Sequence, residues 1–536
     1  MKMQSFTFKK IFLFIIIQLM CMPMFAAKGE FLIESVTPAS ASVFVKTIPV
    51  RNFLQSINGF INSTFTASQK KDLLSFADDF KTKTGIDFLN ESHLRKAGVD
   101  VSKPIACAYA NADRHEEKMM LFIPVLDPKT APMKIAQLLN PDDNAKPVIS
   151  KYNDIEIYRL NGIFYFPIAV YCVISSNEDF AKQAIDLSTG KGSALNADPM
   201  YKKYLSNINK KNEINAYVKP NVLGDVEKML DLGSKDTPVI EYISFGFSIN
   251  SSKIGAVLGV EYNGDNPQVA SYIDLLKPGN TATSLYNSQM LIYGMLSLDP
   301  EKLKALLTSE EKPKDALSSK STPLPKDALS NEVTKLNRST GLDLVEEFLP
   351  NMVGTFNIYM ENPLTGDYVI YVPMKDAAKT KTLMTKFQAA MKAKHEPEKK
   401  FGATTIAKAP GFWVRNPNNK RTFYCSNARG VFLGTNSDLI AKVMGFQTVS
   451  AIKTKDATLS KMDANLFMIA RVRKNDLLGQ LIVAQLSRHG LVSAGDMADL
   501  SKAASKIGDI FLTGVKKKNY IEFQFDVSLP KTPAKK

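Results

Sequence analysis

One motif is written twice in this chain: residues 82–94 read TKTGIDFLNESHL, and residues 337–349 read NRSTGLDLVEEFL. Aligned on their shared TG[IL]D mark, the two stretches set Asp87 over Asp343. Further matches keep the same order, with LFIPVLD (121–127) over IYVPMKD (370–376) and CVISSNEDFAKQAI over VFLGTNSDLIAKVM. Because order and approximate spacing persist over such a length, the pattern predicts a duplicated domain rather than a short-period repeat.

The duplication predicts two α+β domains, residues 28–270 and residues 271–530, each with a largely antiparallel sheet and packed helices. Strand candidates with alternating apolar residues are interspersed with helix candidates in both copies. Each copy closes with two strand candidates joined by a turn of hairpin length, YISFGFSIN with KIGAVLGVEYN and GDIFLTGV with NYIEFQFDV. Pro124 and Pro373 occupy matching strand positions, which indicates an edge strand or a strand end.

The recurring polar residues are those that begin and end helices. A glycine after a helical run, as in both TG[IL]D marks, is typical of a helix C-terminus. Asp87 and Asp343 then stand where an N-cap is needed, and Ser176 and Thr435 open matching [ST]-x-x-D patterns. We therefore expect capping residues at these positions, not paired catalytic carboxylates or a metal site.

A polar insertion interrupts the second copy at about 308–332 and holds the six letters PKDALS twice. Its composition, rich in Lys, Ser, Pro and acidic residues, is typical of a solvated segment. Residues 1–27 have the layout of a secretory signal peptide, with three lysines, the apolar run IFLFIII and a small-residue end at Ala26-Ala27. We expect the mature chain to be exported and to end in a basic tail at residues 531–536.

Nearly all of the net charge of +15 lies in the second half of the 536-residue chain. Residues 375–429 are especially rich in Lys and Arg, which would attract an anionic lipid, a polysaccharide or an acidic envelope protein. Nucleic acid is not an expected partner after export. A basic face that only maintains solubility is the alternative.

No residue pattern points to a reaction. The 4 histidines are scattered, with no HxH or HExxH spacing, and no GxSxG or GxxxxGK[ST] motif is present. After removal of the signal, three cysteines remain, and their spacing fits neither a zinc site nor a disulfide framework. We expect no metal, no cofactor and no catalytic residue, although a site assembled from distant loops stays open as an alternative.

The best candidate for a binding surface is APGFWVRNPNNKRTFYC (409–425), which contains the only Trp of the chain. NPNN can turn a hairpin, and an aromatic ring beside cations can stack on a sugar or hold acidic groups. The alternative is that the aromatic residues cover the core while the charges remain solvated. The candidate binding residues are Trp413, Arg415, Lys420, Arg421, Lys399 and Lys400.

The chain resembles a family of uncharacterised exported bacterial proteins that is known only as a domain of unknown function. The resemblance is carried by the TG[IL]D marks, a strand ending in Asp before a helix, and an Asp-Pro ahead of an aromatic helix, here Asp198-Pro199-Met200-Tyr201. It implies export and no known reaction. The second copy lacks a clear Asp-Pro.

These observations favour a non-catalytic exported protein of the periplasm or cell envelope, with association with the outer membrane left open. It would act as a scaffold or as a binding surface for an anionic envelope component. Two alternatives remain: a hydrolase of envelope polymers with a site between the copies, and a carrier of an apolar ligand. The sequence does not determine the oligomeric state.

Overall fold

The computed structural model describes residues 32–529 with internal gaps. The residues outside the description are 1–31, 65–73, 75–76, 83, 112–116, 140–145, 224–239, 266–269, 272, 280–281, 309–330, 332, 336, 339, 363–364, 397, 399, 453–464, 475–507 and 530–536. The predicted signal peptide, most of the polar insertion, the basic tail and Lys399 therefore lie outside the described residues.

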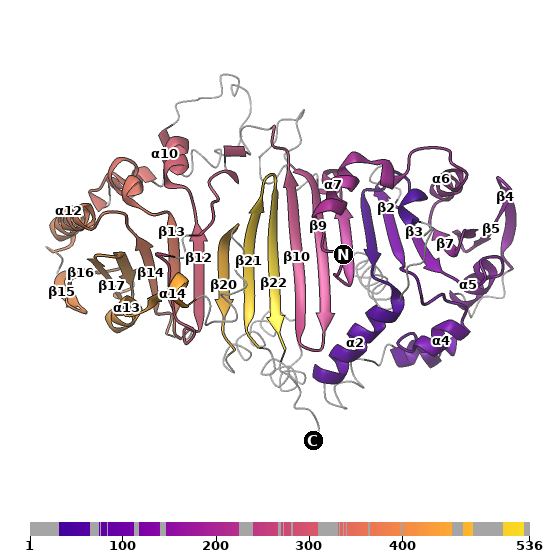
Figure 1. Ribbon diagram of the computed structural model, residues 1–536, viewed down its shortest axis with the longest axis horizontal. Helices are drawn as coiled ribbons and strands as arrows, with labels where there is room; N and C mark the ends of the chain where they lie inside the picture. Colours follow the sequence, from indigo (N-terminus) through magenta and orange to yellow (C-terminus); the bar gives the residue numbers. More distant parts are fainter. Residues whose placement is uncertain are drawn as a thin grey trace.

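A single 20-stranded sheet runs through the molecule (Figure 1), and neighbouring strands in it are antiparallel. From its outer edge to the centre, the first half contributes β4 (Val148–Tyr152), β5 (Ile155–Leu160), β6 (Ile163–Ile168), β7 (Tyr171–Ser175), β3 (Glu117–Pro124), β2 (Ala106–Asn111), β1 (Val43–Thr47), β8 (Ile214–Val218), β9 (Ile240–Asn250) and β10 (Lys253–Tyr262).

The second half has the same order of strands. From its own outer edge to the centre it contributes β15 (Phe401–Ile406), β16 (Ala409–Arg415), β17 (Arg421–Asn427), β18 (Gly430–Gly434), β14 (Tyr368–Pro373), β13 (Thr355–Met360), β12 (Ile292–Ser297), β20 (Leu466–Val472), β21 (Ile510–Lys517) and β22 (Tyr520–Ser528). Each strand occupies the place of its counterpart in the first half, from β4 and β15 at the two edges to β10 and β22 at the centre.

The two halves meet where β10 pairs with β22, in the middle of the molecule (Figure 1). Val257, near the middle of β10, lies opposite Gln524, near the middle of β22. The hairpin turn between Asn250 and Lys253 in the first half corresponds to the turn between Lys517 and Tyr520 in the second. The pairing therefore relates the two closing hairpins by an approximate two-fold axis near Val257 and Gln524.

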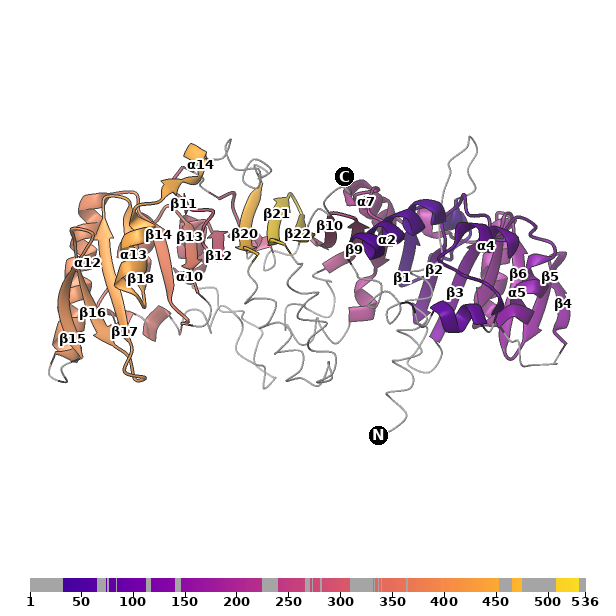
Figure 2. The same ribbon diagram turned by 90° about the horizontal axis from the view of Figure 1, so that it is seen from below.

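Helices cover both faces of the sheet in each half (Figure 2). On one face, the cores contain side chains from α6 and α7 in the first half and from α13 and α14 in the second. On the opposite face, α2 and α4 pack in the first half, and α10 and α12 in the second. The helix bounds are α2 (Val50–Thr64), α4 (Glu91–Lys96), α5 (Ala131–Leu139), α6 (Glu178–Ser188), α7 (Pro199–Asn207), α10 (Pro300–Thr308), α12 (Ala377–His395), α13 (Ser437–Met444) and α14 (Val449–Ile452).

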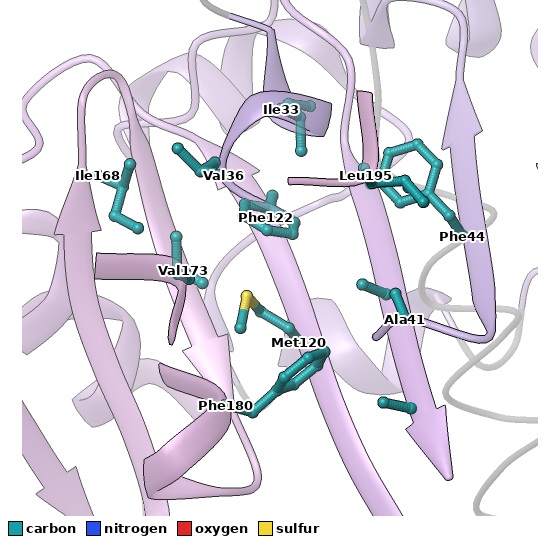
Figure 3. Close-up of a cluster of buried hydrophobic side chains, with 14 of the residues drawn as sticks. Ile33, Val36, Ala41, Phe44, Met120, Phe122, Ile168, Val173, Phe180 and Leu195 are labelled. Atoms are coloured by element: carbon teal, nitrogen blue, oxygen red, sulfur yellow. The ribbon is translucent and has the colours of Figure 1, made fainter. Parts of the chain in front are cut away.

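Alternation along the strands explains why two cores form. In β3, Met120 and Phe122 point to the same face and are fully buried with Val173 of β7 and Phe180 of α6 (Figure 3). Leu121, between them, packs against the cluster on the opposite face. Successive side chains of a strand point to opposite faces, so one strand serves two layers of helices. The predicted α+β class with a largely antiparallel sheet is confirmed.

Both predicted strand ends and one of the four predicted caps are present, and the other three cap residues differ. Pro124 and Pro373 are the last residues of β3 and β14, as expected for strand ends. Asp343 accepts hydrogen bonds from the first backbone N–H groups of the turn 344–348. Asp87, in contrast, accepts from Leu89 N within a turn, and Asn90 caps α4.

The [ST]-x-x-D patterns predict the N-caps of two helices one residue too early. Asn177 and Asn436, not the preceding Ser176 and Thr435, are the N-caps of α6 and α13. The two hydroxyls instead accept hydrogen bonds from the neighbouring strand, at Met119 N and Tyr368 N. Asparagine is as good a cap as serine, so the hydroxyls are available to hold the strand beside the helix start.

Candidate functional site

The predicted basic hairpin forms at the outer end of the second half, between β16 and β17. Asn416 N donates to Lys420 O (2.8 Å), and Lys420 N donates to Asn416 Oδ1 (2.9 Å). Asn419 has a left-handed φ of 63°, which asparagine tolerates better than most residues. The NPNN turn thus closes the hairpin as the sequence indicated.

Trp413 lies on the sheet between two neighbours of different size. It is opposite Phe423 of β17 and opposite Gly402 of β15. A Cβ atom at Gly402 would lie 2.5 Å from the indole ring, so only glycine leaves room for the ring here. The half-buried ring therefore has a fixed position on this face.

Two guanidinium groups flank the Trp413 ring. The guanidinium carbon of Arg421 is 4.4 Å from the ring centroid, and that of Arg415 is 5.8 Å away. Both distances are within the range of cation–π attraction. The structure thus brings Trp413, Arg415 and Arg421 into one cluster, which we call the arginine–tryptophan cluster.

The described residues do not balance the charges of this cluster. Arg415 and Arg421 are directly opposite each other in the β16–β17 pairing, and like charges in that position destabilise a sheet. Within the described residues, Arg415, Lys420 and Arg421 have no ion-pair partner, and the buried Nε of Arg415 has no hydrogen-bond acceptor. A bound anion would relieve both the repulsion and the unsatisfied donor.

The other two predicted binding residues, Lys399 and Lys400, are not part of this cluster. Lys400 is adjacent, because its carbonyl oxygen accepts from Arg415 N at 2.8 Å, but its ammonium group is paired with Glu398. Lys399 lies outside the described residues. The cluster with the exposed Lys420 is therefore the part of the prediction that the geometry assembles.

The opposite face of this hairpin packs against α12. Phe412 and Val414 are buried with Met391 of α12, and the Phe387 ring of the same helix lies 5.3 Å from the Phe412 ring. Trp413 belongs to none of the core clusters of the described residues. Phe423 does pack against a core cluster, so covering the core accounts for Phe423 but not for Trp413.

Metal ligands and reactive thiols are the other groups that could perform chemistry. Among the described residues, no group of three or more His, Cys, Asp or Glu side chains could hold a metal ion. The three cysteines of the described residues form no disulfide with one another. Burial raises the pKa of the Cys172 thiol, and it raises that of Cys425 to about 12, which disfavours the reactive thiolate.

The junction of the two halves holds a polar pocket whose lining includes Glu522 and Asp526. These residues are four apart in one strand, so their Cα atoms lie about 13 Å apart, farther than the roughly 5–10 Å between the carboxyl groups of glycosidase pairs. Each carboxylate is also held by a lysine, Lys517 or Lys253. This arrangement gives no support to a hydrolase with paired carboxylates at this place.

Sequence reasoning placed a site between the copies only as an alternative and identified no residue of the junction pocket. Its floor depends on the pairing of β10 with β22, and no local sequence motif indicates that pairing.

In the part of the chain that is described, no helix is long and apolar enough to span a bilayer.

Comparisons with known proteins give a family and distant structures. The family model described as "Protein of unknown function (DUF3352)" matches residues 69–406, a range that includes parts of both halves. No curated protein matches the chain. Three crystal structures of a protein titled TP0453 are similar over part of the chain. Form IV has 12% identity and a TM-score of 0.25, covering 44% of this chain and 82% of that chain. Form I has 13% identity and a TM-score of 0.24, and form III 10% and 0.26; each covers 47% of this chain and 90% of that chain.

Proposed function

The chain belongs to the DUF3352 family, and because the description of that family names no activity, we propose a function from the geometry. The protein is a non-catalytic, exported protein of the bacterial cell envelope that acts as a scaffold or binding surface for an anionic envelope component. The arginine–tryptophan cluster, with Lys420, is the contact surface. The observation that carries this proposal is the pair of opposed arginines without an acidic partner among the described residues.

The cluster fits phosphate or carboxylate groups. A guanidinium group binds such groups through two parallel hydrogen bonds, and Arg415 and Arg421 are side by side on neighbouring strands. Trp413 offers an apolar ring beside them, suited to the sugar or glycerol portion that carries the anionic group. An anionic lipid, an acidic polysaccharide or an acidic region of an envelope protein shares this chemistry.

The architecture is proposed to derive from a tandem duplication of residues 28–270 and 271–530. The identical order of strands in the two halves supports the duplication, as does the placement of Asn177 and Asn436 as matching helix caps. The two copies differ in charge, so the anion-binding surface belongs to the second copy alone. Export rests on the signal-like residues 1–27.

The test is binding of the purified protein to two anionic probes at low and high salt. One arm uses vesicles of phosphatidylglycerol mixed with phosphatidylcholine, and the other uses an immobilised acidic polysaccharide. The double variant K420E/R421E is compared with K210E/K211E, which makes the same change in net charge at exposed lysines of the first half. We expect salt-sensitive binding that only K420E/R421E abolishes.

The arms separate the sources, because a lipid partner binds vesicles and a polysaccharide partner binds the resin. Equal loss in both double variants would mean that only net charge matters, and the proposed surface would be wrong. Absence of binding in both arms at low salt would also refute it.

A further inference from the structure

The junction pocket is a cavity of about 320 Å³ on one face of the central sheet. Its floor comes from β9 and β10 of the first half and from β22 of the second, and its wall comes from the segment between α7 and β8. Pockets for small ligands have volumes of roughly 300–1,000 Å³. The cavity is at the lower end of this range, and neither half forms it alone.

The charges in the pocket neutralise each other. Lys253 Nζ is 2.6 Å from Asp526 Oδ1, and Lys517 Nζ is 3.2 Å from Glu522 Oε2. Each cation therefore has its own anion on a neighbouring strand. Unlike the arginine–tryptophan cluster, this site offers no excess charge to an ionic ligand.

Amide side chains supply most of the remaining polar groups, and each has one end fixed. Asn207 Nδ2 donates to Tyr242 Oη (2.7 Å), Asn212 Nδ2 donates to Asn215 Oδ1 (3.2 Å), and Gln524 Nε2 donates to Asp526 Oδ2 (2.7 Å). Within the described residues, the amide oxygens of Asn207, Asn212 and Gln524 have no hydrogen-bond donor. The pocket therefore presents oriented acceptors.

Asn209 supplies hydrogen-bond donors to the pocket. Its Oδ1 accepts from Lys211 N (3.0 Å), which leaves its amide N–H groups as donors. Ile208 and Val257 contribute apolar surface beside these groups. A few oriented polar groups on a partly apolar floor are typical of a site that fixes a small ligand in one orientation.

We propose that the junction pocket binds a neutral saccharide about one or two sugar rings in size. A hydroxyl group donates one hydrogen bond and accepts others, so several hydroxyls on one ring match acceptors and donors that lie close together. An anion would face three amide oxygens and two carboxylates that already have partners. An apolar ligand would leave the amide oxygens without donors, which is costly in a desolvated site.

The test uses isothermal titration calorimetry with glucose, N-acetylglucosamine, cellobiose and chitobiose as probes, and inorganic phosphate as the anionic comparison. We expect at least one saccharide to bind and phosphate not to bind. Because the ligand is neutral, its affinity is expected to be the same at low and high salt. This separates the site from the salt-sensitive arginine–tryptophan cluster, so either proposal can fail alone.

Two variants locate the site. Gln524→Ala removes one hydrogen bond and is expected to weaken saccharide binding about fivefold, and Val257→Trp is expected to abolish it by filling the cavity. Gln447→Ala, at an exposed glutamine of the second half outside the pocket, is the control and is expected to bind as the unmodified protein does. Circular dichroism checks the fold of each variant.

Three results would overturn the proposal. They are no binding of any of the four saccharides, saccharide binding that Val257→Trp leaves intact in a folded protein, and phosphate binding that the same variant abolishes.

Discussion

Replacing Gly259 with alanine tests the contact between the two halves. A Cβ atom at this position of β10 would lie 1.9 Å from Tyr520 Oη and 2.4 Å from Tyr520 Cζ of β22. Tyr520 is only 3% exposed, and its hydroxyl shares a hydrogen bond with Ser244 Oγ (2.9 Å). The ring therefore has little room to move away from a new methyl group.

The expected cost follows from these contacts. Overpacking a buried site costs about 1–3 kcal/mol, and disturbing the Ser244–Tyr520 hydrogen bond adds about 1 kcal/mol. Removing a glycine from a strand offsets about 0.5–1 kcal/mol. We expect Gly259→Ala to lower the free energy of unfolding by about 1–3 kcal/mol.

A double-mutant cycle isolates the contact. In a Tyr520→Ala background the new methyl group meets no ring, although Ser244 Oγ still lies 2.3 Å from the Cβ position, so Gly259→Ala is expected to cost clearly less there than in the unmodified protein. Urea unfolding followed by circular dichroism gives the four free energies. An equal cost of Gly259→Ala in both backgrounds would refute the proposed packing of β10 against β22.

Three further predictions concern caps, a buried carboxyl group and the thiols. Asn177→Ala and Asn436→Ala are each expected to lower the free energy of unfolding by about 1 kcal/mol, because each removes an N-cap; urea denaturation measures this, and a neutral result at either site would contradict its assignment. Burial raises the pKa of Glu261 above its ordinary value of 4.5, against the opposing effect of Lys203. The folded protein therefore holds this proton more tightly than the unfolded chain, so the contribution of Glu261 to stability falls as pH rises from about 4.5 through the raised pKa. Glu261→Gln is expected to remove that fall in urea titrations at several pH values, and an unchanged pH dependence would contradict it. Cys172 and Cys425 are buried and Cys107 is partly exposed, so a thiol reagent is expected to modify Cys107 first and the other two only on unfolding; fast labelling of Cys172 in the native protein would be inconsistent with its burial.

The sequence predicted the local structure better than the pairing of distant strands. Alternation of apolar residues indicated the closing hairpins, and Pro124 and Pro373 marked strand ends. The pairing of β10 with β22 depends on complementarity between segments more than 250 residues apart, for which periodicity gives no information. The sequence therefore indicated two antiparallel units but not that their sheets join.

At the starts of α6 and α13, two neighbouring residues could each act as the N-cap, and the sequence patterns indicated the wrong one. Ser176 and Asn177 are both good caps, and only the neighbouring strand decides between them, because Met119 N takes the serine hydroxyl. The same competition occurs at Thr435 and Asn436. Local sequence rules give the position of a helix start to within one residue here.

In the basic hairpin, too, the sequence predicted the local turn but not the contacts with the neighbouring strand. The NPNN turn and the surrounding cations were evident, but the face on which Trp413 lies was not, since the register depends on Gly402 in the next strand. The absence of an acidic partner for Arg415 and Arg421 among the described residues is a property of the folded sheet. No composition count could have shown it.

The most direct test of the account uses the intrinsic fluorescence of Trp413, the only tryptophan of the chain. Its ring is in contact with the Arg421 guanidinium, so an anion that binds this arginine changes the surroundings of the indole. We expect titration with phosphatidylglycerol vesicles or an acidic polysaccharide to give a saturable change in emission that high salt reverses and that Arg421→Glu eliminates. An emission spectrum that stays constant while the protein binds the probe would show that the contact surface lies elsewhere.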